Sequence, residues 1–340
     1  MNGFCTSKSK SGPTAAEAIL DELNERYLDG EDDFKVTAKD VRNVVDAWVR
    51  LEEMSKAEAL IDRYEDTLLN EDDSEATEFL AQIYRSMLFG WAKQLDTKRA
   101  KVYLDEMIES GMEVDGIAFE RIIDANSQIG KVASLKHSYS VFEIAEQLRQ
   151  NGKLIPTERL YNSFIRALTK CGDPNAPKKS LLLLNRMNTL YEEGNSEIQP
   201  TTFTYNAVLY ACSQAAENKS SDFNEAFGVA VKAFNDLRKT QDGPDHMSFG
   251  NMLRCSALLP QGDKRDGLIA STFKLCCQSG FVNAYVLRDL QYSAPEAMWR
   301  SLVGLPQGEL DEESVPPEWR YRFEKRKQSR QRREFSRPRR

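Results

Sequence analysis

The residues best suited to bind a metal ion are six cysteines and two histidines. They are Cys5, Cys171, Cys212, Cys255, Cys276, Cys277, His137 and His246. A structural zinc site usually takes its thiolate and imidazole ligands in pairs a few residues apart. No C-x-x-C pair occurs in this chain. We therefore expect no metal ion and no other cofactor, and reduced cysteines that pack as small hydrophobic side chains.

Motifs that position nucleophiles or phosphates are absent from the sequence. There is no Walker loop, no G-x-G-x-x-G dinucleotide turn and no G-x-S-x-G nucleophile elbow. Without such a constellation the chain has no recognisable means of catalysis. We expect a protein that acts by binding and is not an enzyme.

Charge is distributed unevenly along the 340 residues. The net charge is −7 at pH 7. The segment from Pro317 to Arg340 has 11 lysines and arginines against three glutamates, so it carries +8 and the rest of the chain carries −15. An acidic body argues against a wholly basic surface, although one local basic groove remains compatible with it. No run of apolar residues is long enough to span a bilayer, and we expect no membrane partner.

The elements that would position any binding residues are repeated helical hairpins. Tyr84, Tyr161 and Tyr205 each open a segment with apolar residues three and four positions later, which is the period of an amphipathic helix. Weaker copies begin at Val41, Phe119 and Phe249. Each segment precedes a second helical pattern, and five of the six second patterns are followed by glycine, the usual residue just past a helix end. The predicted stops are Gly111, Gly152, Gly194, Gly243 and Gly280.

A helix–turn–helix that recurs about every 35 to 44 residues predicts an all-α, right-handed solenoid. We expect a disordered N-terminus over 1–12 and a solenoid over 13–303, followed by a linker and a basic disordered tail over 304–340. Within the solenoid the pattern predicts a leading helix and six units, then capping helices. Their ranges are 13–28, then 38–72, 81–115, 116–157, 158–201, 202–245 and 246–283, then 284–303.

The repeat resembles the pentatricopeptide repeat (PPR). The unit from Ala81 to Asp115 has that family's length, and it carries Tyr84, Trp91-Ala92-Lys93, Ala100, Met107 and Gly111 at the family's spacings. Tyr161-Asn162 and Tyr205-Asn206 resemble the family's opening signature. The resemblance covers roughly residues 13–292. It implies a protein that binds single-stranded RNA, one base per helical repeat.

The resemblance also implies which residues would contact bases. The residue after the opening aromatic and the last residue of the unit would read one base together. Asn206 with Asp245 would prefer uracil, and Asn162 with Thr201 would form a second pair. Arg85 with Asp115 occupies the same positions in an earlier unit, where Arg85 could contact phosphate or stack on a base.

Further RNA contacts follow from the same resemblance. Arg50, Lys93 and Lys170 lie near the ends of first helices, where cations would contact phosphates. Arg159 and Phe203 lie where a base could be stacked. For the asparagines the alternative is a solvent-exposed helix start, and for the cations it is a favourable helix C-terminus.

The resemblance implies a role in organellar RNA stability, processing or translation, in a mitochondrion or plastid. The first residues show no clear transit peptide. The main alternative is a helical scaffold for protein–protein contact whose RNA face has degenerated. The basic tail could bind a protein partner. DNA is not an expected partner.

Overall fold

The computed structural model describes residues 9–64, 68, 74–217, 223–305, 307–323 and 325. All regular secondary structure in these residues is helical. The chain forms two compact units, Met1–Pro156 and Thr157–Arg340. No helix in the described part of the chain is long and apolar enough to cross a membrane.

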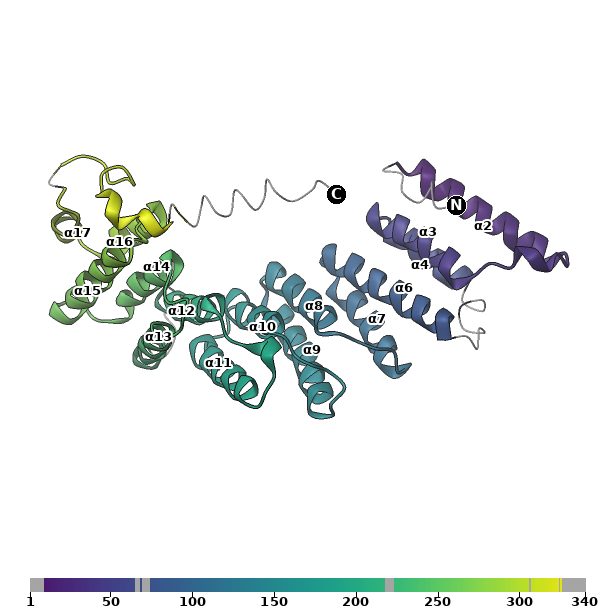
Figure 1. Cartoon of the computed structure of the whole chain (residues 1–340), viewed down its shortest axis with the longest axis horizontal. Helices are drawn as coiled ribbons and strands as arrows, with labels where there is room; N and C mark the ends of the chain where they lie inside the picture. Colours follow the sequence, from purple (N-terminus) through teal and green to yellow (C-terminus); the bar gives the residue numbers. More distant parts are fainter. Residues whose placement is uncertain are drawn as a thin grey trace. The chain divides into compact units, whose positions relative to one another are not determined.

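Unit 1 consists of a leading helix and three helical hairpins (Figure 1). The leading helix α2 packs on α3, and the hairpins are α3/α4, α6/α7 and α8/α9. The first helices α3, α6 and α8 pack side by side. The bounds are α2 (Ser11–Leu28), η1 (Asp32–Phe34), α3 (Ala38–Arg50), α4 (Met54–Arg63), α6 (Ser74–Lys93), α7 (Thr97–Glu109), α8 (Gly116–Ile129) and α9 (Val132–Gln150).

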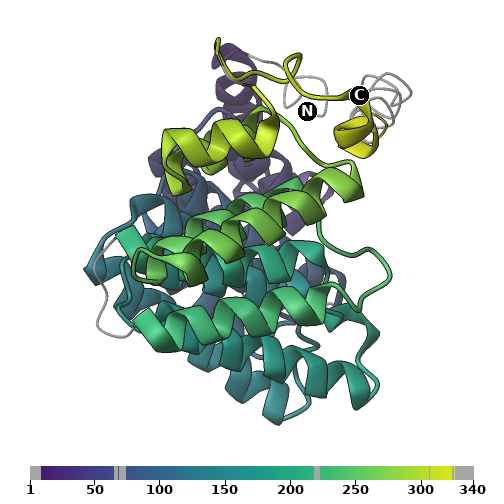
Figure 2. The same ribbon diagram turned by 90° about the vertical axis from the view of Figure 1, so that its left-hand side faces the viewer.

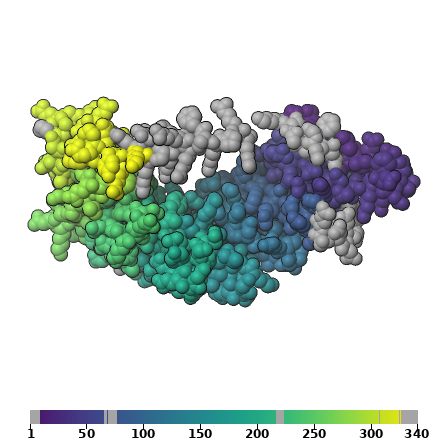
Figure 3. All heavy atoms as spheres, viewed as in Figure 1, coloured from purple at the N-terminus to yellow at the C-terminus, as the bar shows by residue number. Residues whose placement is uncertain are grey.

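Unit 2 continues the same pattern with α10/α11, α12/α13 and α14/α15. Its helices lie roughly parallel to one another in layers in Figure 2, and Figure 3 shows the same helices in space-filling form, coloured teal, green and yellow. The bounds are α10 (Glu158–Lys170), α11 (Ala176–Glu192), η2 (Ser196–Ile198), α12 (Thr202–Glu217), α13 (Phe223–Leu237), α14 (His246–Cys255), η3 (Ser256–Leu258), α15 (Asp263–Ser279), α16 (Ala284–Ser293), α17 (Glu296–Val303) and η4 (Pro317–Trp319).

Helix α10 illustrates how the sequence builds these hairpins. Leu160, Tyr161, Phe164, Ile165 and Leu168 are each at most 3% exposed, and their spacing places them on one face of the helix. That face cannot be buried within one hairpin, so neighbouring hairpins must stack. The predicted all-α fold of stacked helical hairpins is confirmed by this arrangement.

The glycines predicted to stop the second helices have the required backbone. All five have φ between 62° and 106°, the left-handed region that only glycine adopts without strain. The predicted start of the second unit at residue 81 is late, because α6 already begins at Ser74. Residues 65–67 and 69–73, which include the predicted end of the first unit, lie outside the described residues.

Two findings revise the predicted C-terminal end. Helix α16, predicted as a cap, packs on α14 as α14 packs on α12, so it is a further first helix. The stretch after residue 304, predicted as a linker and disordered tail, packs on the fold as far as Phe323. Val315 is 3% exposed, and the Trp319 carbonyl accepts a hydrogen bond from Val282 N at 2.8 Å. Aromatic residues among the charges supply the apolar area for this contact. Residues 326–340 lie outside the described part of the chain.

Candidate functional site

The four first helices of unit 2 share one register, because each begins directly after a capping side chain. Thr157 Oγ1 accepts from Leu160 N, and Asp245 Oδ1 accepts from Met247 N and Ser248 N. Thr201 Oγ1 accepts from Phe203 N, and Asn283 Oδ1 from Val286 N. Such caps satisfy backbone donors that a helix start leaves unpaired. Positions counted from the cap therefore correspond from helix to helix.

Three of these positions carry the polar and aromatic residues of interest. The second residues after the caps are Arg159, Phe203, Met247 and Tyr285. The fifth are Asn162, Asn206, Gly250 and Arg288, and the ninth are Arg166, Tyr210, Arg254 and Tyr292. The ninth position thus alternates cation and aromatic ring, a combination suited to phosphates and bases.

A groove of about 690 Å³ runs along α10, α12 and the start of α14. It is lined by Asn162, Arg166, Lys170, Thr202, Phe203, Asn206, Ala207, Tyr210, Asp242, Asp245, His246, Met247 and Asn251. Seven of the predicted site residues belong to unit 2. Five of these line the groove (Asn162, Lys170, Phe203, Asn206 and Asp245), and Thr201 and Arg159 do not.

Asn206 and Asp245, predicted to act as a pair, are in direct contact. Asn206 Nδ2 donates to Asp245 Oδ1 at 3.0 Å, and Ser248 Oγ donates to Asn206 Oδ1 at 2.6 Å. These contacts fix the orientation of the Asn206 amide. An amide keeps a second N–H and a second acceptor lone pair, so Asn206 can still bond a ligand in the groove.

Asn162 and Thr201, the second predicted pair, meet through a residue that the sequence analysis missed. Glu158 Oε1 accepts from Asn162 Nδ2 at 3.0 Å, from Thr201 Oγ1 at 2.5 Å and from Thr204 Oγ1 at 2.9 Å. Asn162 is only 3% exposed, and its buried Oδ1 has no hydrogen-bond partner. The spacing in the sequence indicates this contact, because Glu158 lies one helical turn before Asn162 and side chains four residues apart are neighbours on a helix.

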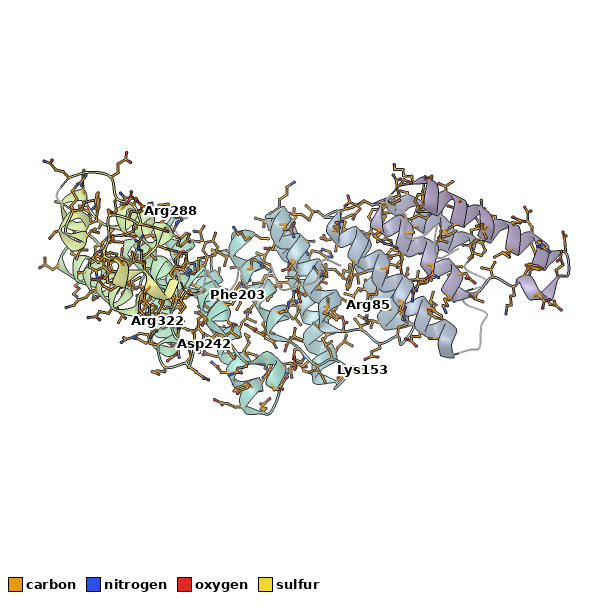
Figure 4. The ribbon with its side chains drawn as sticks, turned by 45° about the horizontal axis from the view of Figure 1, so that its top comes forward. Arg85, Lys153, Phe203, Asp242, Arg288 and Arg322 are labelled. Carbon is orange, nitrogen blue, oxygen red and sulfur yellow. The ribbon has the colours of Figure 1, made fainter. Side chains whose placement is uncertain are left out.

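Stacking and charged side chains border the groove. Phe203, labelled in Figure 4, is 58% exposed, which is unusual for so large an apolar ring. Lys170 Nζ lies 5.4 Å from the centre of the Tyr210 ring. Asp242, also labelled in Figure 4, adds a negative charge from the loop before α14. Arg159 is exposed on the first turn of α10.

Comparison with solved structures finds pentatricopeptide repeat proteins. The crystal structure of PPR10 from maize is 14% identical with a TM-score of 0.46, over 83% of this chain and 39% of that chain. The structure of PPR10 in complex with an 18-nucleotide psaJ RNA element is 18% identical with a TM-score of 0.40, over 85% and 42%. The likeness concerns the fold alone, and the chain spans about two fifths of those proteins. Neither a protein-family model nor a curated protein matches the sequence.

Of the four predicted site residues of unit 1, Arg85, Asp115 and Lys93 lie in ion pairs or a helix cap. Arg85 Nη1 lies 3.4 Å from Asp115 Oδ2, and Asp115 also caps α8 through Ile117 N and Ala118 N. Lys93 Nζ lies 2.7 Å from Glu52 Oε1. Arg50 is exposed at the end of α3.

The ninth position after the caps differs between the units. In unit 1 it carries Asp46 after the Thr37 cap and Asp124 after the Asp115 cap. In unit 2 the same position carries arginine or tyrosine. Unit 2 is therefore the better candidate for binding an anion.

Proposed function

We propose that the chain binds single-stranded RNA in the groove of unit 2 and acts by occupancy, without catalysis. The observation that carries the proposal is Phe203, an exposed aromatic ring at the edge of a groove that also holds an oriented amide and two cations. Single-stranded nucleic acid is typically bound by such a combination of aromatic side chains and cations.

Each part of the groove suits one part of a nucleotide. Phe203 offers a face on which a base can stack. Asn206, held by Asp245 and Ser248, offers a donor and an acceptor at fixed positions, as readout of a base edge requires. Arg166 and Lys170 supply positive charge for the phosphates.

Two finer proposals rest on the resemblance of the sequence to the PPR family. We propose that the bound RNA is an organellar transcript whose stability, processing or translation is altered, in a mitochondrion or plastid. We also propose that the basic C-terminal segment, residues 325–340, contacts a protein partner. Fluorescence microscopy of the tagged full-length protein tests the compartment, and copurification with and without this segment tests the partner.

Fluorescence anisotropy with a short labelled single-stranded RNA of mixed sequence tests RNA binding. Phe203→Ala should weaken binding by ~1–3 kcal/mol if one base stacks on the ring. Tyr191→Ala is the matched control, because Tyr191 is an exposed aromatic (41%) on the second helix α11, outside the groove. It should leave the affinity unchanged.

The protein scaffold is the rival function, and Asp242 in the groove favours it. If the wild-type chain fails to bind RNA even at about 50 mM salt, where electrostatic attraction is strong, the RNA proposal is wrong. Equal losses in the Phe203 and Tyr191 variants would place binding outside the groove.

A further inference from the structure

Helix α16 extends the row of first helices by one member and brings Arg288 to the same carboxylate, Asp289, that Arg254 of α14 approaches. Arg288, labelled in Figure 4, stands at the fifth position after the Asn283 cap, and its side chain is 63% exposed. Arg254 stands at the ninth position of α14, with its side chain 21% exposed. Counted from the caps, Arg288 therefore corresponds to Asn206, and Arg254 corresponds to Arg166.

A buried carboxylate lies between the two arginines. Asp289 is 1% exposed, and its Oδ1 lies 3.6 Å from Arg254 Nη1 and 3.6 Å from Arg288 Nη2. Neither carboxylate oxygen of Asp289 takes part in a hydrogen bond. Its effect on the arginines is therefore electrostatic. A single negative charge between two positive ones leaves the cluster with a net charge of +1.

Gly250 makes room for this carboxylate. A Cβ at Gly250 would come within 2.6 Å of Asp289 Oδ2 and 2.9 Å of Tyr285 Cε1. Asp289 therefore occupies the space in which α14 would otherwise present a side chain at its fifth position. Because Gly250 has no side chain, Asp289 fits between the two arginines.

Each arginine also lies against a tyrosine. The Arg254 guanidinium is 5.3 Å from the centre of the Tyr292 ring, and that of Arg288 is 4.6 Å from the Tyr285 ring. Such contacts restrict the planar guanidinium group. Two restrained guanidinium groups suit an anion with several oxygens, because each can donate two parallel hydrogen bonds.

We propose that Arg254 and Arg288, positioned by Asp289, bind phosphates of the RNA backbone and extend the groove by one helix. This proposal rests on the proposed function and names the part of the RNA that the α14/α16 face contacts. A phosphate contact fits better than a base contact, since Gly250 offers no side chain and Asp289 is buried. The contact should therefore be independent of base sequence.

The salt dependence of binding by the full chain tests the arginines. For single strands, log affinity falls with log salt by about 0.7 per phosphate contacted, so Arg254→Gln/Arg288→Gln should reduce the slope by about 1.4. The weakening should be equal for labelled oligo(U) and oligo(A). The control is Lys178→Gln/Lys232→Gln, which removes two ion-paired cations from the second helices α11 and α13. It should not change the slope.

The Asp289→Asn variant distinguishes the positioning of the two arginines by Asp289 from its effect on the net charge of the cluster. This variant makes the cluster more positive, so charge alone predicts tighter binding. If Asp289 positions the arginines, binding should instead weaken at every salt concentration, with circular dichroism showing an intact helical fold. Tighter binding by Asp289→Asn, or an unchanged slope in the double arginine variant, would overturn the proposal.

These outcomes are distinct from failure of the proposed function. If the wild-type chain binds RNA and Phe203→Ala weakens that binding, the groove proposal stands even where the arginine variants behave as wild type. If the wild-type chain does not bind RNA, both proposals fail together.

Discussion

Asn206 donates from Nδ2 to Asp245 Oδ1 at 3.0 Å, across 39 residues of sequence. Asp245 Oδ1 also accepts from Met247 N at 3.0 Å and from Ser248 N at 3.1 Å. One carboxylate oxygen thus caps α14 and orients the amide on α12. Substitutions can separate the capping of α14 by Asp245 from its proposed contact with an RNA base.

Asp245→Ala should destabilise the protein by about 1 kcal/mol, because it removes an N-cap side chain. Asn206→Ala should destabilise the protein by less, because Asp245 still caps α14 in that variant. Urea unfolding followed by circular dichroism measures both. Equal free energies of unfolding for Asp245→Ala and the wild type would show that the cap contributes nothing.

Glu158→Ala should be more costly than its half-buried position suggests. The substitution removes an acceptor shared by Asn162, Thr201 and Thr204, and it leaves the buried Asn162 amide without its partner. A buried donor left unpaired costs ~1–3 kcal/mol. Thermal unfolding should show this loss, and Glu158→Gln should recover part of it because its amide oxygen can still accept. An unaffected melting temperature in Glu158→Ala would contradict this account.

Gly250→Ala and Gly228→Ala should change stability in opposite directions. A methyl group at Gly250 would meet Asp289 and Tyr285, and such overpacking costs ~1–3 kcal/mol. Gly228 lies within α13 and has no atom within 4 Å of the added Cβ, so alanine there should stabilise by ~0.5–1 kcal/mol. Chemical denaturation of both variants decides the question, and stabilisation by Gly250→Ala would exclude the predicted clash.

His137 should make stability depend on pH in the mildly acidic range. Burial lowers the pKa of His137, with Lys101 adding to the shift, and the ring Nδ1 lies 3.1 Å from Thr97 Oγ1. The unfolded chain then takes up a proton on this residue at a higher pH than the folded chain. Its contribution to stability is complete above the unfolded pKa of about 6.5 and is lost as pH falls through the lowered folded pKa.

A His137→Asn variant isolates this effect. The difference in unfolding free energy between the wild type and the variant should shrink as the pH is lowered from 7.5 towards 5. Denaturant titrations of the full chain at several pH values measure it. A difference that stays constant over this range would exclude His137 as the titrating group.

The amphipathic period and the glycine stops were enough to predict the hairpins from sequence. Leu160, Phe164 and Leu168 recur within α10, and Gly194 follows the end of the next helix, so both signals act over a few residues. The same local signals placed Asn162 and Asn206 at matching helix starts. Their roles in RNA binding, with those of Thr201, Asp245 and the predicted cations, stay predictions.

Only the tertiary structure decided how exposed each side chain is and which residues from other helices it contacts. Asn162 is 3% exposed whereas Asn206 is partly exposed, although the sequence gives them equivalent positions. The contact of Asp289 with Gly250 and the packing of Trp319 on Val282 join residues more than 30 positions apart.

The sequence by itself therefore determined the repeating hairpins and the helix starts at which polar side chains stand. The tertiary structure decided which of these side chains are buried, which are paired and which face a groove. The physical reason is that periodicity and capping act within one or two helical turns. Exposure and pairing depend instead on side chains that the next hairpin supplies from about 40 residues away, as Asp245 does for Asn206.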